Sequence, residues 1–263
     1  MPISRSVGRT ARNDLTDVLL VQILINMNSH RFPDPTRQAL RTDGRIGPGT
    51  IGAIEEFETA VMQQAESDGM LVPGDATIRA LLDGLPAGPT REKLQVVMPR
   101  ALPEKIDRCY EPLVKGMTKY EIDTPLRAAH FIAQIGHETA SFLYMEEIAD
   151  GSRYEGRTDL GNTEPGDGKR FKGRGLIQLT GRANYAAYSN DCGVDYVTNP
   201  AAIATDPFAC IDVACWYWHK RKINRLADKD DVKAVTKAVN GGFNGLDDRM
   251  DYLYRSKAVL AIT

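Results

Sequence analysis

The sequence predicts an all-α protein built from two helical parts. Three apolar segments with helical spacing occupy the first 85 residues, and a long, largely apolar helix lies near the middle of the chain. Between them, Pro86-Ala-Gly-Pro89 breaks regular structure, because proline and glycine interrupt helices and strands. We therefore expect a first domain over residues 1–85, a linker over residues 86–94 and a larger domain over residues 95–263.

The composition is that of an ordinary globular protein. Hydrophobic residues make up 42% and charged residues 26% of the 263 residues, and the formal net charge is −2. Nucleic-acid-binding domains usually carry a basic surface, so nucleic acid is not an expected partner. The apolar run over residues 18–25 is too short to cross a membrane and indicates a buried helix. We expect a monomer without stable membrane association.

The cysteines predict a reduced protein that is made in a cytoplasm. Cys109, Cys192, Cys210 and Cys215 show no CxxC spacing, and we expect buried thiols in place of disulfides. No apolar stretch of a signal peptide follows the arginines near the N-terminus. Any action outside the cytoplasm would therefore need a separate export route.

The first part is predicted to contain three helices, over residues 15–27, 51–62 and 76–82. Two turns that begin with Asp-Gly separate these helices. Thr50 is expected to cap the second helix, because its hydroxyl can accept a hydrogen bond from the first free backbone amides.

This order of helices and turns resembles the small peptidoglycan-binding module of many cell-wall hydrolases. The resemblance covers about residues 14–83 and implies that Asp43, Gly44 and Phe57 belong to a wall-binding site. One departure is Glu58, where the family usually has glutamine. The matching residues are Asp43-Gly44, Ile46-Gly47-Pro48, Thr50, Ala53, Phe57, Asp68-Gly69, Thr77 and Leu81-Leu82.

A helix is predicted over residues 126–143, because Thr124-Pro125 is a strong helix start. Most of its circumference is apolar, and one narrow polar stripe runs along it, which is more typical of the floor of a cleft than of open solvent. A buried helix with a hydrogen-bonded stripe is the alternative. The stripe consists of Arg127, His130, Gln134, His137, Glu138 and Ser141.

Glu138 is the candidate general acid on this stripe. Helical spacing places it near Phe131 and Phe142, whose rings would exclude water from the carboxyl and keep it protonated, as an acid catalyst requires. A zinc site on His130 and His137 was weighed against this hypothesis. The segment that follows His137 is not HExxH, so no metal is expected.

Candidate partners of Glu138 follow further along the chain. Glu146, Glu147 and Glu155 could each supply a second carboxylate. If residues 176–180 are extended, Gln178 and Thr180 point to one side and could hold a sugar or a water.

Two motifs together resemble glycoside hydrolase family 19, which contains chitinases and the lysozyme-type endolysins of bacteriophages. The resemblance spans about residues 95–262 and implies an all-α, bilobal, lysozyme/chitinase-like domain with a substrate cleft and an inverting mechanism. The motifs are Gln134-x-x-His-Glu-Thr139 and Gly173-Arg-Gly-Leu-Ile-Gln-Leu-Thr-Gly-Arg-Ala-Asn-Tyr185, supported by Val239-Asn-Gly-Gly242, Asp248-Arg249 and an amphipathic helix over residues 250–260.

The resemblance implies a role for each matching residue and no cofactor. Glu138 aligns with the general acid, Glu147 with the second glutamate, and Thr180 with the residue that holds the nucleophilic water. Glu146 and Glu155 stay open as alternatives to Glu147. The expected sugar-binding residues are His137, Gln178, Asn184, Tyr185, Asn240 and Arg249.

The combined hypothesis is a modular phage or prophage endolysin that hydrolyses the β-1,4 glycan backbone of bacterial peptidoglycan and lyses the host. The resemblance implies synthesis in the host cytoplasm, release through a holin and action in the periplasm. Two alternatives stay open: a chitinase that acts on GlcNAc polymers, and a wall-anchoring protein whose hydrolase domain is inactive.

Overall fold

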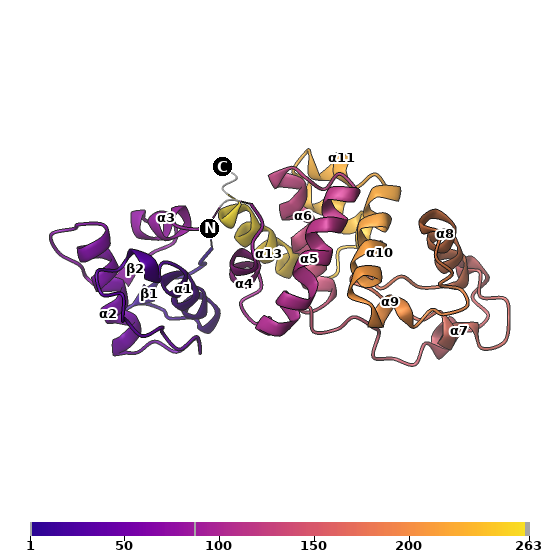
Figure 1. The fold of residues 1–263 in the computed structure, drawn as a ribbon, viewed down its shortest axis with the longest axis horizontal. Helices are drawn as coiled ribbons and strands as arrows, with labels where there is room; N and C mark the ends of the chain where they lie inside the picture. The colour runs from indigo at the N-terminus through magenta and orange to yellow at the C-terminus, as the bar shows by residue number, and fades with distance from the viewer. Residues whose placement is uncertain (1, 87, 261–263) are drawn as a thin grey trace. The chain divides into compact units, whose positions relative to one another are not determined.

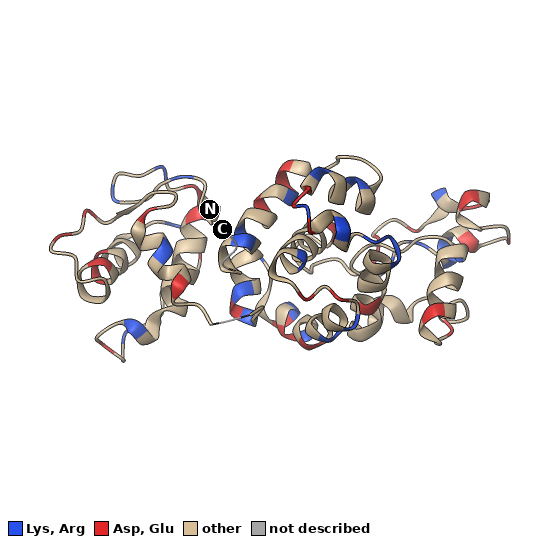
Figure 2. Ribbon diagram, turned by 90° about the horizontal axis from the view of Figure 1, so that it is seen from above, with Lys and Arg blue, Asp and Glu red and all other residues tan. Residues whose placement is uncertain are grey.

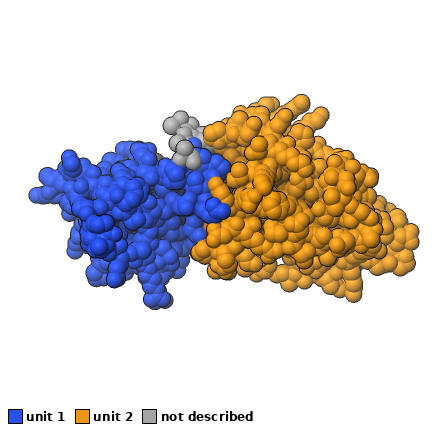
Figure 3. Space-filling view, in the orientation of Figure 1, with its two compact units in different colours: residues 1–100, 254–263 blue, residues 101–253 orange. Residues whose placement is uncertain are grey.

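A computed structural model describes residues 2–86 and 88–260 of the chain. It is mostly helical, with thirteen α-helices and one two-stranded ribbon among these residues, which confirms the all-α prediction (Figure 1). The chain divides into two compact units, residues 1–100 with 254–263, and residues 101–253 (Figure 3). This division describes packing, and the expected boundaries of the functional domains stay a prediction.

The first unit contains four helices and both strands. The strands pair in antiparallel fashion, with Val7 opposite Leu71. Acidic and basic residues are interspersed along the helices of both units (Figure 2). In chain order the elements are β1 (Val7–Gly8), α1 (Leu15–Met27), a 3-10 turn (Ser29–Arg31), α2 (Pro48–Glu56), a π-helical turn (Phe57–Val61), β2 (Met70–Leu71), α3 (Ala76–Asp83) and α4 (Arg91–Val97).

The three helices expected in this unit are confirmed. Every residue of α1 from position 17 to position 25 is buried, so the apolar run is a core helix as expected. The prediction that Thr50 caps α2 is wrong. Pro48 occupies the first helical position and Gly47 the cap, because a fixed proline φ already suits a helix start. Thr50 is buried, and its hydroxyl accepts from Gln22 at 3.2 Å.

The second unit contains the remaining helices, and α13 begins in it. The closest packing is between α5 and α10, where a Cβ at Gly116 would lie 3.0 Å from Cys215 Sγ. The elements are α5 (Pro103–Lys119), α6 (Pro125–Glu138), 3-10 turns (Ser152–Tyr154, Thr158–Leu160), α7 (Asp167–Arg170), α8 (Arg182–Cys192), α9 (Ala202–Thr205), α10 (Pro207–Lys220), α11 (Asn224–Ala227), α12 (Val232–Asn240) and α13 (Leu246–Val259).

Helix α6 starts as predicted, with the Thr124 hydroxyl accepting from a backbone amide of the first turn. The prediction that it continues to residue 143 is wrong, because α6 ends at Glu138. The next residues turn into the left-handed region, with φ of 48° at Ala140, 62° at Ser141 and 63° at Phe142. The apolar pattern continues through this turn because Phe142 is itself fully buried.

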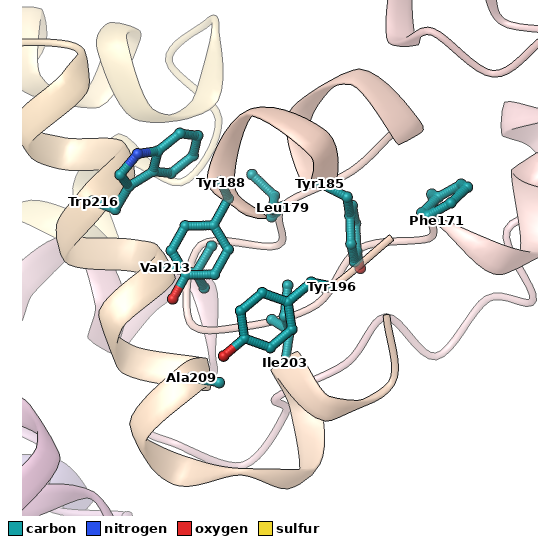
Figure 4. Close-up of a cluster of buried hydrophobic side chains, with 9 residues drawn as sticks. All are labelled: Phe171, Leu179, Tyr185, Tyr188, Tyr196, Ile203, Ala209, Val213 and Trp216. Carbon is teal, nitrogen blue, oxygen red and sulfur yellow. The ribbon is translucent and has the colours of Figure 1, made fainter. Parts of the chain in front are cut away.

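An aromatic cluster holds the glycine-rich segment that follows α7 (Figure 4). Within the cluster the rings of Tyr188 and Tyr196 stack, with centroids 5.2 Å apart. The extended conformation expected over residues 176–180 is wrong: Arg174 and Leu179 pair across a tight turn. The members of the cluster are Phe171, Leu179, Tyr185, Tyr188, Tyr196, Ile203, Ala209, Val213 and Trp216.

The cysteines are free thiols, as predicted. Cys109, Cys210 and Cys215 are buried, and Cys192 is half-buried. Burial raises the pKa of Cys109 to about 11 and that of Cys210 to about 12, so both thiols stay protonated at neutral pH. Across residues 2–86 and 88–260, no helix has the length and apolar character that a bilayer-spanning segment needs.

Two glycine substitutions test how tightly the glycine-rich turn is packed. Gly175 and Gly193 both have left-handed φ, but a Cβ at Gly175 would lie 2.5 Å from Val213 Cγ1, whereas the space around Gly193 is open. Gly193→Ala should therefore cost about 1–2 kcal/mol for the backbone alone, and Gly175→Ala clearly more. Urea unfolding followed by tryptophan fluorescence reports this unit, because both tryptophans lie on α10. Equal losses in the two variants would contradict the tight packing.

Candidate active site

Glu138 is the last residue of α6, and a buried arginine from α13 fixes it. Arg249 is 1% exposed, and its Nη2 donates to Glu138 Oε1 at 2.5 Å. The same guanidinium donates to the Gln134 side chain and, through Nε, to the Asn244 carbonyl at 3.2 Å. Asn240, which is exposed, donates to that carbonyl as well. Among the described residues, the second oxygen of Glu138 has no protein hydrogen bond, so it is available to a substrate.

The surroundings of Glu138 differ from those that helical spacing predicts. Phe131 and Phe142 are both fully buried, as expected for residues on the apolar side of α6. Periodicity along one helix cannot reveal a partner from another helix, and the structure adds the guanidinium of Arg249. The Glu138 side chain retains 19% exposure, which leaves its free oxygen in reach of a ligand.

His137 is oriented by two residues near the start of α13. Its Nδ1 lies 2.6 Å from Asp248 Oδ2, and its side chain is 26% exposed. The ring packs on Gly245, where a Cβ would lie only 2.1 Å from His137 Cε1. A glycine at this position therefore allows the imidazole to lie beside Glu138, with Nε2 not engaged in any protein hydrogen bond that the described residues show.

Glu147 lies against the glycine-rich segment. Its backbone amide donates to the Gly173 carbonyl at 2.9 Å, and the Gly173 amide lies 3.2 Å from Glu147 Oε2. Its other oxygen contacts Arg153 at 2.7 Å and the Tyr154 hydroxyl at 3.2 Å. A Cβ at Gly173 would approach the side chains of both Glu147 and Gln178, so this glycine brings the two close together.

The other two glutamates have different surroundings. Glu146 forms an ion pair with Arg174 at 2.8 Å. Glu155 accepts from the backbone amides of Gly166 at 2.6 Å and Gly168 at 2.8 Å, so both of its oxygens hold a loop together. Both oxygens of Glu147 are engaged as well, and what sets this glutamate apart is its place beside Gln178; its assignment as the second carboxylate stays a prediction.

Three of the predicted site residues lie in or just after the tight turn and stay half-buried. Gln178 has a left-handed φ of 55° and donates to the Gly175 carbonyl. The Thr180 hydroxyl donates to the Gln178 carbonyl at 2.8 Å, and Asn184 donates to the Thr180 carbonyl at 2.7 Å. The chain of hydrogen bonds gives these polar groups a fixed arrangement, as a binding surface requires.

Tyr185 is placed differently from the other predicted sugar-binding residues. Its side chain is 0% exposed, so it cannot touch a ligand in this conformation. The hydroxyl donates to the Lys172 carbonyl at 2.8 Å and accepts from Arg174 at 3.1 Å. Burial raises the pKa of Tyr185 to about 12. Its observed role is to hold the glycine-rich segment in place through these two hydrogen bonds.

The three wall-binding candidates lie in the interior and in a turn of the first unit. Phe57 is 0% exposed, and Gly44 is buried with its amide donating to Gln22. Asp43 is half-buried and accepts from the Arg45 amide at 2.9 Å, which lowers its pKa. The burial of Gly44 and Phe57 gives them a place in the packing of the first unit, and neither can contact a ligand in this conformation.

Sequence reasoning missed several contacts of the site. Arg153 and Tyr154 hold Glu147, and Asp248 holds His137. Tyr252 contacts Ser141 just beyond Glu138. The spacing of these residues in sequence carries no signal of the contacts, because all four partners come from a 3-10 turn or from α13.

The comparisons with known proteins agree with this geometry. Residues 126–238 match the family model of glycoside hydrolase family 19, described as chitinase class I. A glycosyl hydrolase family 19 domain-containing protein of Haemophilus influenzae is 29% identical over 196 residues, which are 63% of this chain and 95% of that protein. The region from 126 to 238 is therefore similar to the chitinase-like domain of glycoside hydrolase family 19, and these similarities support a glycosidase.

Plant chitinases are similar over a shorter stretch. An endochitinase of Arabidopsis thaliana is 36% identical over 114 residues, which are 43% of this chain and 39% of the endochitinase. Chitinase C of Streptomyces griseus HUT6037 has the same fold, with a TM-score of 0.56 and 19% identity over 66% of this chain and 93% of its own. The chain spans less than half the length of the Arabidopsis relative.

Two substitutions separate a ligand contact from a structural support. Gln178→Ala should raise KM for soluble glycan strands about tenfold, the effect of losing one good hydrogen bond to a sugar. Tyr185→Phe should leave KM unchanged and lower the free energy of unfolding by about 1–3 kcal/mol, because the Lys172 carbonyl loses its donor. A raised KM for Tyr185→Phe at unchanged stability would return this tyrosine to the substrate-binding residues.

Proposed function

We propose that the protein is a phage or prophage endolysin that cuts the β-1,4 glycan backbone of peptidoglycan by inversion. The observation that carries the proposal is the contrast between two glutamates. Glu138 is fixed through one oxygen by Arg249 and leaves the other free, while Glu147 lies beside Gln178 and Gly173. An inverting glycosidase needs two such carboxyl groups, about 6.5–9.5 Å apart, on opposite sides of the scissile bond.

Glu138 acts as the general acid in this scheme. The free oxygen carries the proton and transfers it to the glycosidic oxygen as the bond to the anomeric carbon breaks. The transition state resembles an oxocarbenium ion, and the leaving sugar departs as an alcohol. Arg249 limits the rotation of the carboxyl, so the proton is presented in one direction.

Glu147 acts as the general base. It takes a proton from a water whose oxygen forms the new bond to the anomeric carbon, on the face opposite the leaving group. Gln178 and Thr180 are the polar residues best placed to orient that water or the sugar. The reaction needs only the two glutamates and water. After each turnover Glu138 has lost a proton and Glu147 has gained one, so one net proton transfer through solvent restores the starting state.

The first unit supports peptidoglycan as the polymer. Its three helices and its Asp-Gly turns occur in the order that the peptidoglycan-binding resemblance predicts. A module that holds the enzyme on an insoluble polymer raises the local concentration of substrate at the catalytic domain. We further propose a monomer that is made in the host cytoplasm and reaches the wall through a holin.

Chitin is the second candidate substrate. The observation that favours chitin is the similarity to the plant proteins and the Streptomyces griseus protein, which are chitinases. Chitin and peptidoglycan share β-1,4-linked GlcNAc and differ in the lactyl group and stem peptide on alternate sugars. The same two glutamates would act on either polymer.

The roles of the glutamates can be tested with single variants. Glu138→Gln keeps the shape of the side chain but cannot donate a proton, so the rate should fall about 10²–10⁴-fold. Glu147→Ala should also be inactive and should regain activity with azide, because this anion attacks the anomeric carbon in place of the activated water and needs no general base. Glu155→Ala should keep most activity at a lower melting temperature, because its backbone contacts are lost. Azide rescue of Glu155→Ala in place of Glu147→Ala would move the role of the base to Glu155.

The substrate can be tested with two polymers and two fragments. The full chain should clear outer-membrane-stripped cells and release muropeptides faster than it cleaves soluble chitin oligomers. Residues 1–85 should bind purified sacculi, and residues 95–263 should keep activity on soluble glycan strands while binding sacculi more weakly. Faster cleavage of chitin oligomers would make the protein a chitinase, and mass spectrometry of the muropeptides identifies the bond that is cut.

A further inference from the structure

One face of α13 contacts the end of α6 at three successive places. Asp248 reaches His137 at 2.6 Å, and Arg249 reaches Glu138 at 2.5 Å. Tyr252 lies three residues after Arg249, on the same side of the helix, and its hydroxyl is 2.8 Å from that of Ser141. The first two contacts act on residues of the proposed site, whereas the third acts on the chain just beyond it.

The chain that Tyr252 contacts has an unusual backbone. Ala140, Ser141 and Phe142 all have φ between 48° and 63°, a region that side chains with a Cβ avoid. Such conformations persist only where the surrounding structure holds them. Because the turn starts two residues after Glu138, it is what ends α6 at the proposed acid.

Two sets of side-chain hydrogen bonds hold this turn. Thr139 is 0% exposed, and its hydroxyl donates to the Ile135 carbonyl at 2.7 Å and accepts from the Phe142 amide at 2.8 Å. The side chains of Ser141 and Tyr252 are also buried, so water cannot readily replace the hydrogen bond between their hydroxyls. Thr139 ties the turn to α6 itself, and Tyr252 ties it to the helix that carries Arg249.

We propose that Tyr252 is a positioning residue for the acid. Its hydrogen bond to Ser141 fixes the left-handed turn. The turn fixes the backbone at the end of α6, and this backbone sets the direction in which the Glu138 carboxyl points. The same helix fixes the carboxyl directly through Arg249, so α13 holds Glu138 from both the side-chain and the backbone side. This inference rests on the proposed role of Glu138.

The test compares Tyr252→Phe, Ser141→Ala and the double variant on soluble, peptide-free glycan strands. Each single variant should lower kcat about three- to tenfold at unchanged KM, the effect expected from one buried hydrogen bond. The double variant should match the single variants, because both remove the same interaction. Ser141→Gly should recover part of the kcat lost in Ser141→Ala, since glycine adopts the left-handed backbone without strain.

A matched control separates positioning from general stability. Thr77→Val removes another buried side-chain hydroxyl, which donates to Glu58 at 2.8 Å in the first unit and does not touch the proposed site. It should lower the melting temperature and leave both kcat and KM unchanged. If Tyr252→Phe behaves like this control, or raises KM at unchanged kcat, the positioning role is wrong. Glu138→Gln, assayed beside them, tests the proposed function separately: full activity there would overturn the acid assignment itself.

Discussion

The buried guanidinium of Arg249 is the interaction on which the site depends. A cation that is 1% exposed must be compensated, and Glu138, Gln134 and the Asn244 carbonyl supply its acceptors. Removal of one of these acceptors should cost about 1–3 kcal/mol or more, because a donor of the buried guanidinium is then left without a partner. The contacts of Arg249 therefore fix the end of α6 against α13, and two residues of the polar stripe of α6, Gln134 and Glu138, take part in them.

Glu147, the proposed second carboxylate, depends on a different support. Glu147 lies on a loop, and its position follows from the glycine-rich segment to which its backbone and side chain bind. That segment is held in turn by the aromatic cluster and by Tyr185, whose hydroxyl binds the backbone beneath it. The two glutamates thus belong to separate rigid supports, one helical and one aromatic, as a pair with different roles requires.

Four of the nine non-glycine residues with left-handed φ, counted over the described residues, lie at the proposed site, and the other five lie elsewhere. Ala140 to Phe142 and Gln178 have left-handed φ without being glycine, and all lie next to a candidate catalytic or sugar-binding residue. Such strain is maintained by packing elsewhere in the unit. In the first unit, the candidate wall-binding residues Gly44 and Phe57 are buried. The motif that contains them therefore describes how this unit folds more than what it binds.

The sequence by itself determined the three helices α1 to α3, the start of α6 and the identity of Glu138, Glu147 and Gln178 as candidates, because periodicity and motifs are local. It failed where α6 ends and where residues 176–180 turn, because buried Phe142 and Leu179 keep the apolar pattern while the backbone changes direction. Only the tertiary structure decided the partners. Arg249 is 111 residues from Glu138 along the chain, and the fold alone brings a helix that distant against the end of α6.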